Sequence, residues 1–260
     1  MSEKPLVSIL ISSYNKGKYL EECLKSCISQ SYKNCEIILL DNYSNDKTNK
    51  ILKKYSKQVK VLKKRKVSKF PSLNQIDLLI KAYKISKGSV ICLLDADDYY
   101  HTKKIEKIKK FFLLKKKINV IFDLPMIKKK NKKIKFKLKQ KFQKDIWPTI
   151  IPTSSISMKR SFFKKCLDMK VFNKFNLLEI DFRINVLAIN FFKNYYILKE
   201  NVTIYRETDG GIMSNIKKYS KKWWIKRNQA HEYMINLLKK NKLKYKNLDY
   251  SLTKMINLFL

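Results

Sequence analysis

Short apolar runs alternate with helix-patterned segments through the first 115 residues, and this alternation restricts the fold more than any other feature. The runs at 7–12, 36–40, 59–62 and 89–94 have the length of strands, and each is followed by apolar residues at helical spacing. The third helical segment is predicted to end with a C-cap at Gly88. Strands that alternate with helices are typical of a mostly parallel sheet flanked by helices. The sequence therefore predicts an α/β fold with one large domain.

The alternation weakens after residue 115. A strand at 118–123 precedes a basic stretch at 128–144, which we interpret as an edge hairpin with one wet face. A polar loop enters a strand at 152–158, an amphipathic helix is expected over 178–192, and 219–260 is predicted to be helical. We divide the chain into a first half (1–115), a second half (116–215) and a basic helical tail (216–260).

The charge balance is strongly basic, with 59 Lys and Arg against 21 Asp and Glu and a net charge of +38. Such a surplus fits a nucleic-acid binder, an enzyme on an anionic membrane, or a general compositional bias toward lysine. Basic residues occur in every segment, which favours bias over a specific nucleic-acid partner. Trp223 and Trp224 in the basic tail are compatible with peripheral docking on an anionic membrane.

The cysteines and the apolar runs indicate in which cellular compartment the protein is expected. The five cysteines include no C-x-x-C pair, so buried free thiols are predicted. No secretory signal is recognised and no apolar run approaches the roughly 18 residues of a spanning helix. We therefore expect a cytoplasmic protein.

Acidic side chains follow two of the predicted strands. Asp41 ends the strand at 36–40, and Asp95, Asp97 and Asp98 follow the strand at 89–94. Strand ends of a parallel sheet share one crevice, and carboxylates there suit a divalent cation that carries a nucleotide diphosphate. For Asp41 alone, an Asx turn or helix cap is an equally good interpretation.

Residues 5 to about 112 resemble the donor-binding half of family-two glycosyltransferases with the GT-A fold. The resemblance is carried by PLVSILISSYN at 5–15, LDNYSNDKT at 40–48 and GSVICLLDADD at 88–98. It implies a transferase that takes a sugar from a nucleotide diphosphate, with UDP favoured. The nucleotide base would be held by Ser12, Tyr14 and Asp41, assisted by Asn15.

The resemblance also assigns the remaining donor contacts. In the D-x-D element Asp95-Ala96-Asp97, Asp95 would lie toward the ribose, and Asp97 would hold a Mn²⁺ or Mg²⁺ ion and the diphosphate, with Asp98 beside them. Asn74 matches a family asparagine, but Ser72 stands where an arginine is common. Arg206 resembles an arginine that contacts the diphosphate, whereas the usual histidine nearby is absent and Thr208 or Asp209 lies in its place.

The second half resembles the family around residues 178–183. Asp181 is the implied catalytic base of an inverting transfer, and Glu179 is the reserve candidate; acidic residues in a first helical turn also have a purely capping interpretation. His101 could approach the metal, although a surface histidine is the commoner outcome. Segment 147–155 could line the acceptor pocket, with a core tryptophan as the alternative.

The resemblance thus implies an inverting, metal-dependent transferase acting on a glycan or lipid-linked acceptor in surface polysaccharide synthesis, at the inner face of the membrane. A nucleotidyltransferase is disfavoured because the first strand is not followed by a Gly-rich basic loop. The remaining alternatives are a nucleic-acid-binding protein and a transferase-like protein that has lost its activity.

Overall fold

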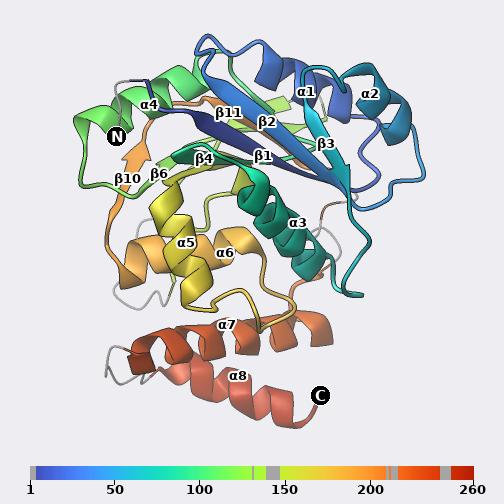
Figure 1. Ribbon diagram of the computed structural model, residues 1–260. Coiled ribbons are helices and arrows are strands. Elements are labelled where there is room, and N and C mark those ends of the chain that lie inside the picture. The colour runs from blue at the N-terminus through green and yellow to red at the C-terminus, as the bar shows by residue number, and fades with distance from the viewer. Residues whose placement is uncertain (1–3, 131, 139–146, 209–210, 212–215, 241–246) are drawn as a thin grey trace.

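The computed structural model describes residues 4–130, 132–138, 147–208, 211, 216–240 and 247–260, without the side chains of 238–240. A seven-stranded sheet forms the centre, with strand order β10-β6-β9-β4-β1-β2-β3, and a four-stranded sheet of order β5-β11-β7-β8 lies beside it. Helices cover both faces of the large sheet (Figure 1). This is the α/β, mostly parallel arrangement that the sequence predicts.

The first half alternates strictly between strands and helices. Its elements are β1 (Val7–Ser13), α1 (Leu20–Ile28), β2 (Cys35–Asp41), α2 (Thr48–Lys54), β3 (Lys60–Lys63), α3 (Pro71–Ile85), β4 (Val90–Asp95), β5 (Tyr99–Tyr100) and α4 (Lys104–Leu114). Strand β1 is buried along its whole length and pairs in parallel with β2 on one side and β4 on the other. Apart from the two-residue β5, every one of these elements is predicted by the sequence.

The second half is less regular. It comprises β6 (Val120–Asp123), β7 (Met126–Lys129), β8 (Lys132–Lys135), a 3₁₀ turn (Thr153–Ser155), β9 (Ile156–Lys159), α5 (Arg160–Asp168), α6 (Ile180–Asn185), a π-helical segment (Val186–Phe191), β10 (Tyr195–Leu198), β11 (Thr203–Arg206), α7 (Lys221–Lys240) and α8 (Leu248–Leu258). Strand β9 runs antiparallel between β4 and β6, so one sheet continues from the first half into the second.

Three local predictions need correction or restriction. Helix α3 ends with its C-cap at Ser86, and Gly88 instead lets the chain approach β1, since a Cβ there would lie 2.6 Å from the Ser8 nitrogen and 2.9 Å from the Leu6 carbonyl oxygen. The helix expected over 178–192 is a short α6 that passes into a π-helical segment. The predicted edge hairpin is present as β7 and β8, with β8 exposed, while 139–146 lie outside the described residues.

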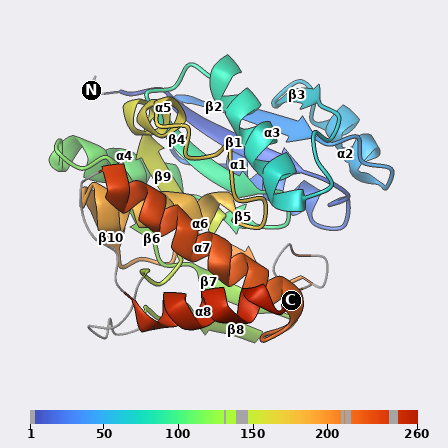
Figure 2. The ribbon, with the colours of Figure 1, turned by 90° about the horizontal axis from the view of Figure 1, so that it is seen from below.

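Two apolar layers sandwich the large sheet. Val7, Ile9 and Ile11 of β1 pack toward α1, α2 and α4, whereas Leu10 packs toward α3, α5 and α6. The pair α7 and α8 lies below the second layer, side by side (Figures 1 and 2).

The cysteines and the helices provide two further observations. All five thiols are free; Cys35 is half-buried and the others are buried, as predicted. None of the helices in the described part of the chain combines the length and the apolarity that crossing a bilayer requires.

Candidate active site

The carboxyl ends of three adjacent strands form one edge of the site. In the parallel register, Ser12 of β1 lies opposite Asp95 of β4, and Ser13 lies opposite Asp41 of β2. Asp41 and Asp95 therefore flank the end of β1 at a backbone separation of about 10 Å, twice the spacing of neighbouring strands. The register alone brings these two predicted residues to a common edge.

Asp95 is held by a ring of polar side chains. Its Oδ1 accepts hydrogen bonds from Ser12 Oγ at 3.1 Å and from Gln75 Nε2 at 2.7 Å. Its N–H donates to Ser154 Oγ, and the next residue, Ala96, donates its N–H to the Ser12 carbonyl oxygen. Burial raises the pKa of Asp95 to about 6, and the neighbouring Asp97 carboxylate adds to the rise.

Asp97 lies at the mouth of the site. Its Oδ2 accepts a bond from Lys16 Nζ at 2.5 Å and one from Thr208 Oγ1 at 3.2 Å. The Lys16 and Asp97 side chains keep 19% and 13% of their surface exposed, so solvent reaches the pair. Thr208 is thus the residue that meets Asp97 where the family places a histidine, and Asp209 lies outside the described residues.

Asp98 points inward. It is 1% exposed and accepts bonds from Ser154 Oγ at 2.6 Å and from the Arg206 N–H at 2.7 Å. Burial and the charges of Asp97 and Asp95 raise its pKa well above the ordinary value. Asp98 therefore anchors β11 to the turn after β4 and is not available to bind a solvent-borne cation.

Arg206 joins three parts of the site. Its guanidinium donates to the Asp97 carbonyl oxygen and to the Glu22 carboxylate, and it lies 4.5 Å from the ring centre of Tyr99. The side chain is 7% exposed. Its charge is therefore fixed close to Asp97, and the predicted contact of Arg206 with a diphosphate stays a prediction.

A buried lysine lies beneath the turn. Lys104 of α4 donates to Asp123 Oδ2 at 2.8 Å, to the Ser154 carbonyl oxygen at 2.7 Å and to Thr203 Oγ1 at 2.6 Å. Lys104 and Asp123 are both completely buried. This group, with the Ser154 hydroxyl on Asp98, forms a polar floor under Asp95–Asp98 that sequence patterns did not reveal.

Asp181 approaches the site from the second half of the chain. It lies at the start of α6, and its Oδ1 accepts the Phe182 N–H at 2.7 Å, consistent with the capping interpretation. Burial raises the pKa of Asp181 to about 7, and the charges of Glu179 and Asp95 contribute to the increase. Glu179 is 7% exposed and receives Lys226 Nζ of α7 on both oxygens at 2.6 Å.

Tyr205 of β11 is influenced by the charges of these groups. The pKa of this half-buried phenol is raised by burial and then by the charges of Asp98, Asp181, Asp95 and Asp97. Charge effects of this kind fall off with distance, so each of the four carboxylates lies within electrostatic range of the Tyr205 phenol. Asp181 therefore lies near the turn after β4 in the fold, although 83 or more positions separate them in the sequence.

Comparison with known proteins identifies the family. A sequence model of glycosyl transferase family 2 matches residues 8–167. This chain belongs to glycosyl transferase family 2.

Relatives and solved structures agree with that assignment. An uncharacterised glycosyltransferase of Methanocaldococcus jannaschii is 29% identical over 236 residues, which are 83% of this chain and 76% of that protein. A UDP-Glc:alpha-D-GlcNAc-diphosphoundecaprenol beta-1,3-glucosyltransferase of Escherichia coli, WfaP, is 38% identical over 100 residues, 38% of each chain. The crystal structure of Staphylococcus aureus TarS 1-349 with UDP-GlcNAc shares the fold at a TM-score of 0.64 and 16% identity, over 96% of this chain and 70% of that one.

The residues predicted to bind the nucleotide base are arranged as follows in this family 2 member. Asp41 is completely buried, and its carboxylate accepts hydrogen bonds from the Ser44 N–H at 2.8 Å and from the Ser44 hydroxyl at 2.5 Å. These bonds form the Asx turn that the sequence analysis gave as an alternative for Asp41. Asn15 has a left-handed backbone (φ 52°), and its Oδ1 accepts the Asn45 N–H. Both side chains order the two loops that follow β1 and β2.

Exposed aromatic rings extend from the same loops. Tyr14 is 41% exposed with Lys66 Nζ 3.4 Å from its ring centre, and Tyr43 is 52% exposed with Lys63 and Arg65 nearby. Such rings offer a stacking surface to a nucleotide base. Tyr43 was not singled out from the sequence, although it lies inside the quoted segment 40–48.

Two buried polar atoms, one at the end of β1 and one in α3, lack a partner among the described residues. Ser13 Oγ and Gln75 Oε1 make no hydrogen bond with the described residues. Since buried polar groups are normally paired, these two atoms fit a site completed by a polar ligand. Neither was predicted, because only the folded structure shows which of several polar residues is buried without a partner.

Asn74 and Ser72 have structural partners. The Asn74 amide accepts the N–H groups of Val67 and Ser68 and donates to the Ser68 carbonyl oxygen, so it orders the segment before α3. Ser72 donates to the Asn176 carbonyl oxygen and ties α3 to the second half of the chain. The predicted donor contact of Asn74 stays a prediction.

The histidines and Trp147 lie apart from Asp97's contacts. His101 is exposed, and buried His231 bonds Asp249 at 2.7 Å. Trp147 packs edge-on against Phe182 and His231, at ring separations of 5.9 and 5.1 Å. Trp147 therefore packs against the hydrophobic core, which was the alternative to lining an acceptor pocket. Its neighbour Phe182 directly follows Asp181 in the sequence.

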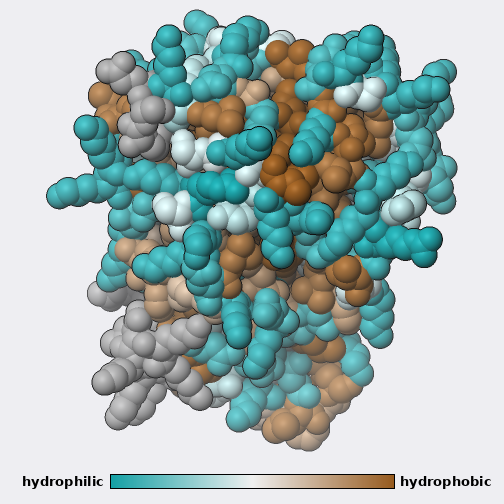
Figure 3. Space-filling model, viewed as in Figure 1, coloured by the Kyte–Doolittle hydropathy of each residue, from teal (hydrophilic) through white to brown (hydrophobic). Residues whose placement is uncertain are grey.

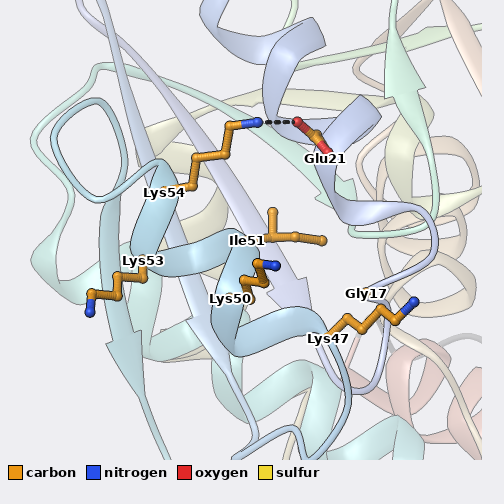
Figure 4. A pocket seen from close by; sticks show the side chains of 7 residues that line it. All are labelled: Gly17, Glu21, Lys47, Lys50, Ile51, Lys53 and Lys54. Carbon is orange, nitrogen blue, oxygen red and sulfur yellow. Dashed lines mark hydrogen bonds and ion pairs between the residues drawn. The ribbon is translucent and has the colours of Figure 1, made fainter.

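A shallow hollow of about 590 Å³ lies between α1 and α2, away from the aspartates. Its lining is rich in lysine, and the Lys54 ammonium is paired with the Glu21 carboxylate at 2.8 Å (Figure 4). The residues around it are Gly17, Glu21, Lys47, Lys50, Ile51, Lys53 and Lys54. It borders the site through Gly17, next to Lys16.

The metal expected for the family can be tested against the donor atoms present. Among the described residues, no three His, Cys, Asp or Glu side chains are arranged to hold a metal ion by themselves. Asp97 and the Thr208 hydroxyl offer hard oxygen atoms, and Asp97 is solvent-accessible. Mg²⁺ and similar ions commonly take one or two carboxylates and complete their shell with phosphate oxygens and water. The residues therefore fit an ion that arrives with a diphosphate.

Proposed function

We propose that this chain is an inverting, metal-dependent glycosyltransferase that moves a hexosyl group from a UDP-sugar to a hydroxyl of a glycan or lipid-linked acceptor in surface polysaccharide synthesis. One observation carries the proposal: Asp181, from the second half of the chain, lies within electrostatic range of Asp95 at the end of β4. In the proposed reaction Asp181 serves the acceptor and the aspartates of the turn after β4 serve the donor. The donors named for WfaP and TarS, and the lipid diphosphate acceptor named for WfaP, support this choice of substrates.

Each residue has a distinct part in the proposed reaction. Ser12, Tyr14, Asn15 and Asp41 shape the base subsite, and Asp95 lies toward the ribose. Asp97 would hold the cation, which supplies Lewis-acid stabilisation of the diphosphate when bound. Arg206, fixed beside Asp97, stabilises the negative charge that develops on the leaving diphosphate.

Asp181 takes the proton of the acceptor hydroxyl. As that oxygen bonds to the anomeric carbon, the bond from this carbon to the diphosphate oxygen breaks and the configuration inverts. A general base works best when its pKa is near the working pH, and the pKa of about 7 for Asp181 satisfies this condition. Glu179 is neutralised by Lys226 and is the weaker candidate.

We place the reaction at the cytoplasmic face of a membrane. Five free cysteines, four of them buried, support a reducing compartment. The exposed apolar and basic residues of α7 and α8 support a location at a membrane.

The proposal is tested by separating donor binding from turnover. Thermal unfolding is measured with UDP-, GDP-, CDP- and dTDP-sugars, with and without Mn²⁺. We expect stabilisation by a UDP-sugar that increases with Mn²⁺, and loss of the Mn²⁺-dependent part in Asp97→Ala. Asp181→Asn should keep the shift but lose about 10²- to 10⁴-fold in kcat.

The matched control is Asp168→Asn, which removes a carboxylate that is 60% exposed and paired only with Lys164. Its donor shift and turnover should equal those of the wild type. Normal turnover by Asp181→Asn would remove the proposed base, and no stabilisation by any nucleotide sugar would remove the donor site.

A further inference from the structure

Helix α8 carries an apolar stripe on its solvent side. Leu248, Leu252, Met255 and Phe259 follow one another at intervals of four, three and four residues, so they lie on one side of the helix. Their exposed fractions are 90%, 48%, 53% and 84%. Figure 3 shows brown side chains gathered at the lower end of the molecule, where Figure 1 places α8.

The opposite side of α8 is polar and faces α7. Asp249 receives Arg227 Nε and Nη2 at 3.1 and 2.7 Å and bonds His231 Nε2 at 2.7 Å. Asn257 donates to the Trp224 carbonyl oxygen, and Thr253 is completely buried. A surface helix normally turns its polar residues outward, so the amphipathic pattern of α8 is inverted. The inward Arg227–Asp249 ion pair and the His231–Asp249 hydrogen bond hold the helix in that orientation.

Basic and aromatic residues border the stripe. Lys217, Lys218, Lys221 and Lys222 are exposed around the start of α7. The Lys221 ammonium donates to the Leu260 carbonyl oxygen, which places the start of α7 beside the end of α8. Acidic side chains of the two helices, Glu232 and Asp249, are fewer, and Asp249 is already paired.

An aromatic cluster lies at the same end. Tyr219 is 63% exposed and packs on Trp223 and Trp224, with ring separations of 5.3 and 6.2 Å. The two tryptophans, which the sequence suggested as docking residues, are only half-exposed. The larger apolar surface is on α8, which the sequence analysis did not single out.

We propose that this surface, the α8 stripe with its lysine border, docks on an anionic lipid surface. Apolar side chains that enter the headgroup layer, lysines that meet anionic lipids and a Trp/Tyr cluster at the boundary are the three components of interfacial binding. A second copy of this chain fits less well. A symmetric contact through the stripe would place one lysine border near the other, and like charges would oppose it.

The docking surface is linked to the candidate active site through α7. Lys226 of this helix neutralises Glu179, two residues before Asp181. An acceptor held in the same membrane would therefore meet the protein on the side of the proposed base. This link rests on the proposed function, whereas the docking itself does not.

The test is cosedimentation of the full chain with vesicles of phosphatidylcholine alone and of phosphatidylcholine mixed with phosphatidylglycerol. We expect binding to the anionic vesicles, weakened by salt because the lysine contribution is screened. Leu252→Gln with Met255→Gln should lower the partition coefficient by about tenfold or more, from the apolar burial lost. Lys218→Gln with Lys222→Gln should lower it by roughly fivefold per lysine.

Matched controls are available elsewhere on the surface. Leu114→Gln removes a 68% exposed leucine at the end of α4, and Lys53→Gln with Lys57→Gln removes two exposed lysines near α2. These variants should bind anionic vesicles like the wild type. All substituted side chains are exposed, and circular dichroism checks that each variant folds.

Two results would overturn the docking proposal. One is equal binding of the stripe variant and the wild type, or no binding by either at low salt. The other is a dimer that Leu252→Gln with Met255→Gln dissociates, without vesicle binding, which would assign the stripe to a second copy. Donor-induced thermal shifts are measured without vesicles, so either result leaves the proposed donor site untouched.

Discussion

Two lysine–aspartate pairs lie on opposite sides of the Asp95–Asp98 turn and differ in almost every respect. Below the turn, Lys104 and Asp123 are completely buried, and the lysine has two further oxygen partners. At the mouth, Lys16 and Asp97 keep 19% and 13% of their side-chain surface exposed. A buried charge that loses its partner is strongly destabilising, whereas an exposed pair exchanges partners at little cost. The floor is therefore structural, and the mouth can accept a ligand.

The largest expected effect is in the floor. Lys104→Met leaves the Asp123 carboxylate buried without its cation, and the free energy of unfolding should fall by about 3–5 kcal/mol. Lys107→Met, one turn along α4, removes a lysine that pairs with Glu200 at the surface and should cost under about 1 kcal/mol. Urea denaturation compares the two variants. Equal losses would mean that the buried pair has no special role.

The second effect is the pH dependence of turnover, which depends on Asp181 at the start of α6. Because Asp181 must be ionised to act as a base and its pKa is about 7, kcat/KM should fall roughly tenfold per pH unit below that value. A rate profile without such a limb would exclude Asp181 as the base.

The same raised pKa has an opposite consequence for stability. The folded pKa lies above the ordinary 3.8, so the folded state binds the extra proton between these values. The contribution of Asp181 to the free energy of unfolding is therefore greatest below about pH 4 and decreases as the pH rises to about 7. Asp181→Asn should flatten this part of the stability curve in donor-free protein.

The third effect tests whether the buried polar floor positions the donor-binding aspartates above it. Ser154 Oγ donates to Asp98 Oδ2 and accepts the Asp95 N–H, so Ser154→Ala removes the hydrogen bond of the Asp95 N–H and one of the two described bonds of Asp98. We expect a loss of about 1–3 kcal/mol in unfolding free energy and a higher KM for the donor. Ser155→Ala is the matched control, since that equally buried hydroxyl makes only a 3.3 Å bond to Asp123. An unchanged KM in Ser154→Ala would show that the floor does not position the donor residues.

The smallest effect is at the mouth itself. Lys16 occupies Asp97 Oδ2, so Lys16→Met should tighten Mn²⁺ binding to donor-free protein by up to about fivefold. Calorimetric titration measures the affinity, with Lys18→Met, an exposed neighbour, as the control. Weaker Mn²⁺ binding in Lys16→Met would contradict the view that lysine and metal compete for Asp97.

Some residues of the site could be predicted from the sequence, and others could not. Asp41 and Asp95 are recognisable because each directly follows a buried strand, and parallel strands end at a common edge. Gln75 and Ser13 lie next to predicted residues, yet only the folded structure shows that each has a buried polar atom without a partner among the described residues. The Gly88 prediction was wrong because a glycine after a helix has two uses, and the close approach to β1 is not visible locally.

The sequence by itself determined the alternating strands and helices of the first half, the family and the acidic residues at the strand ends. These features depend on periodicity and on neighbours along the chain. Only the tertiary structure decided the insertion of β9, the polar floor, the Lys226–Glu179 pair and the outward stripe of α8. Those depend on contacts between distant segments, such as Lys104 with Thr203, 99 residues apart, whose pairing is set by packing in three dimensions.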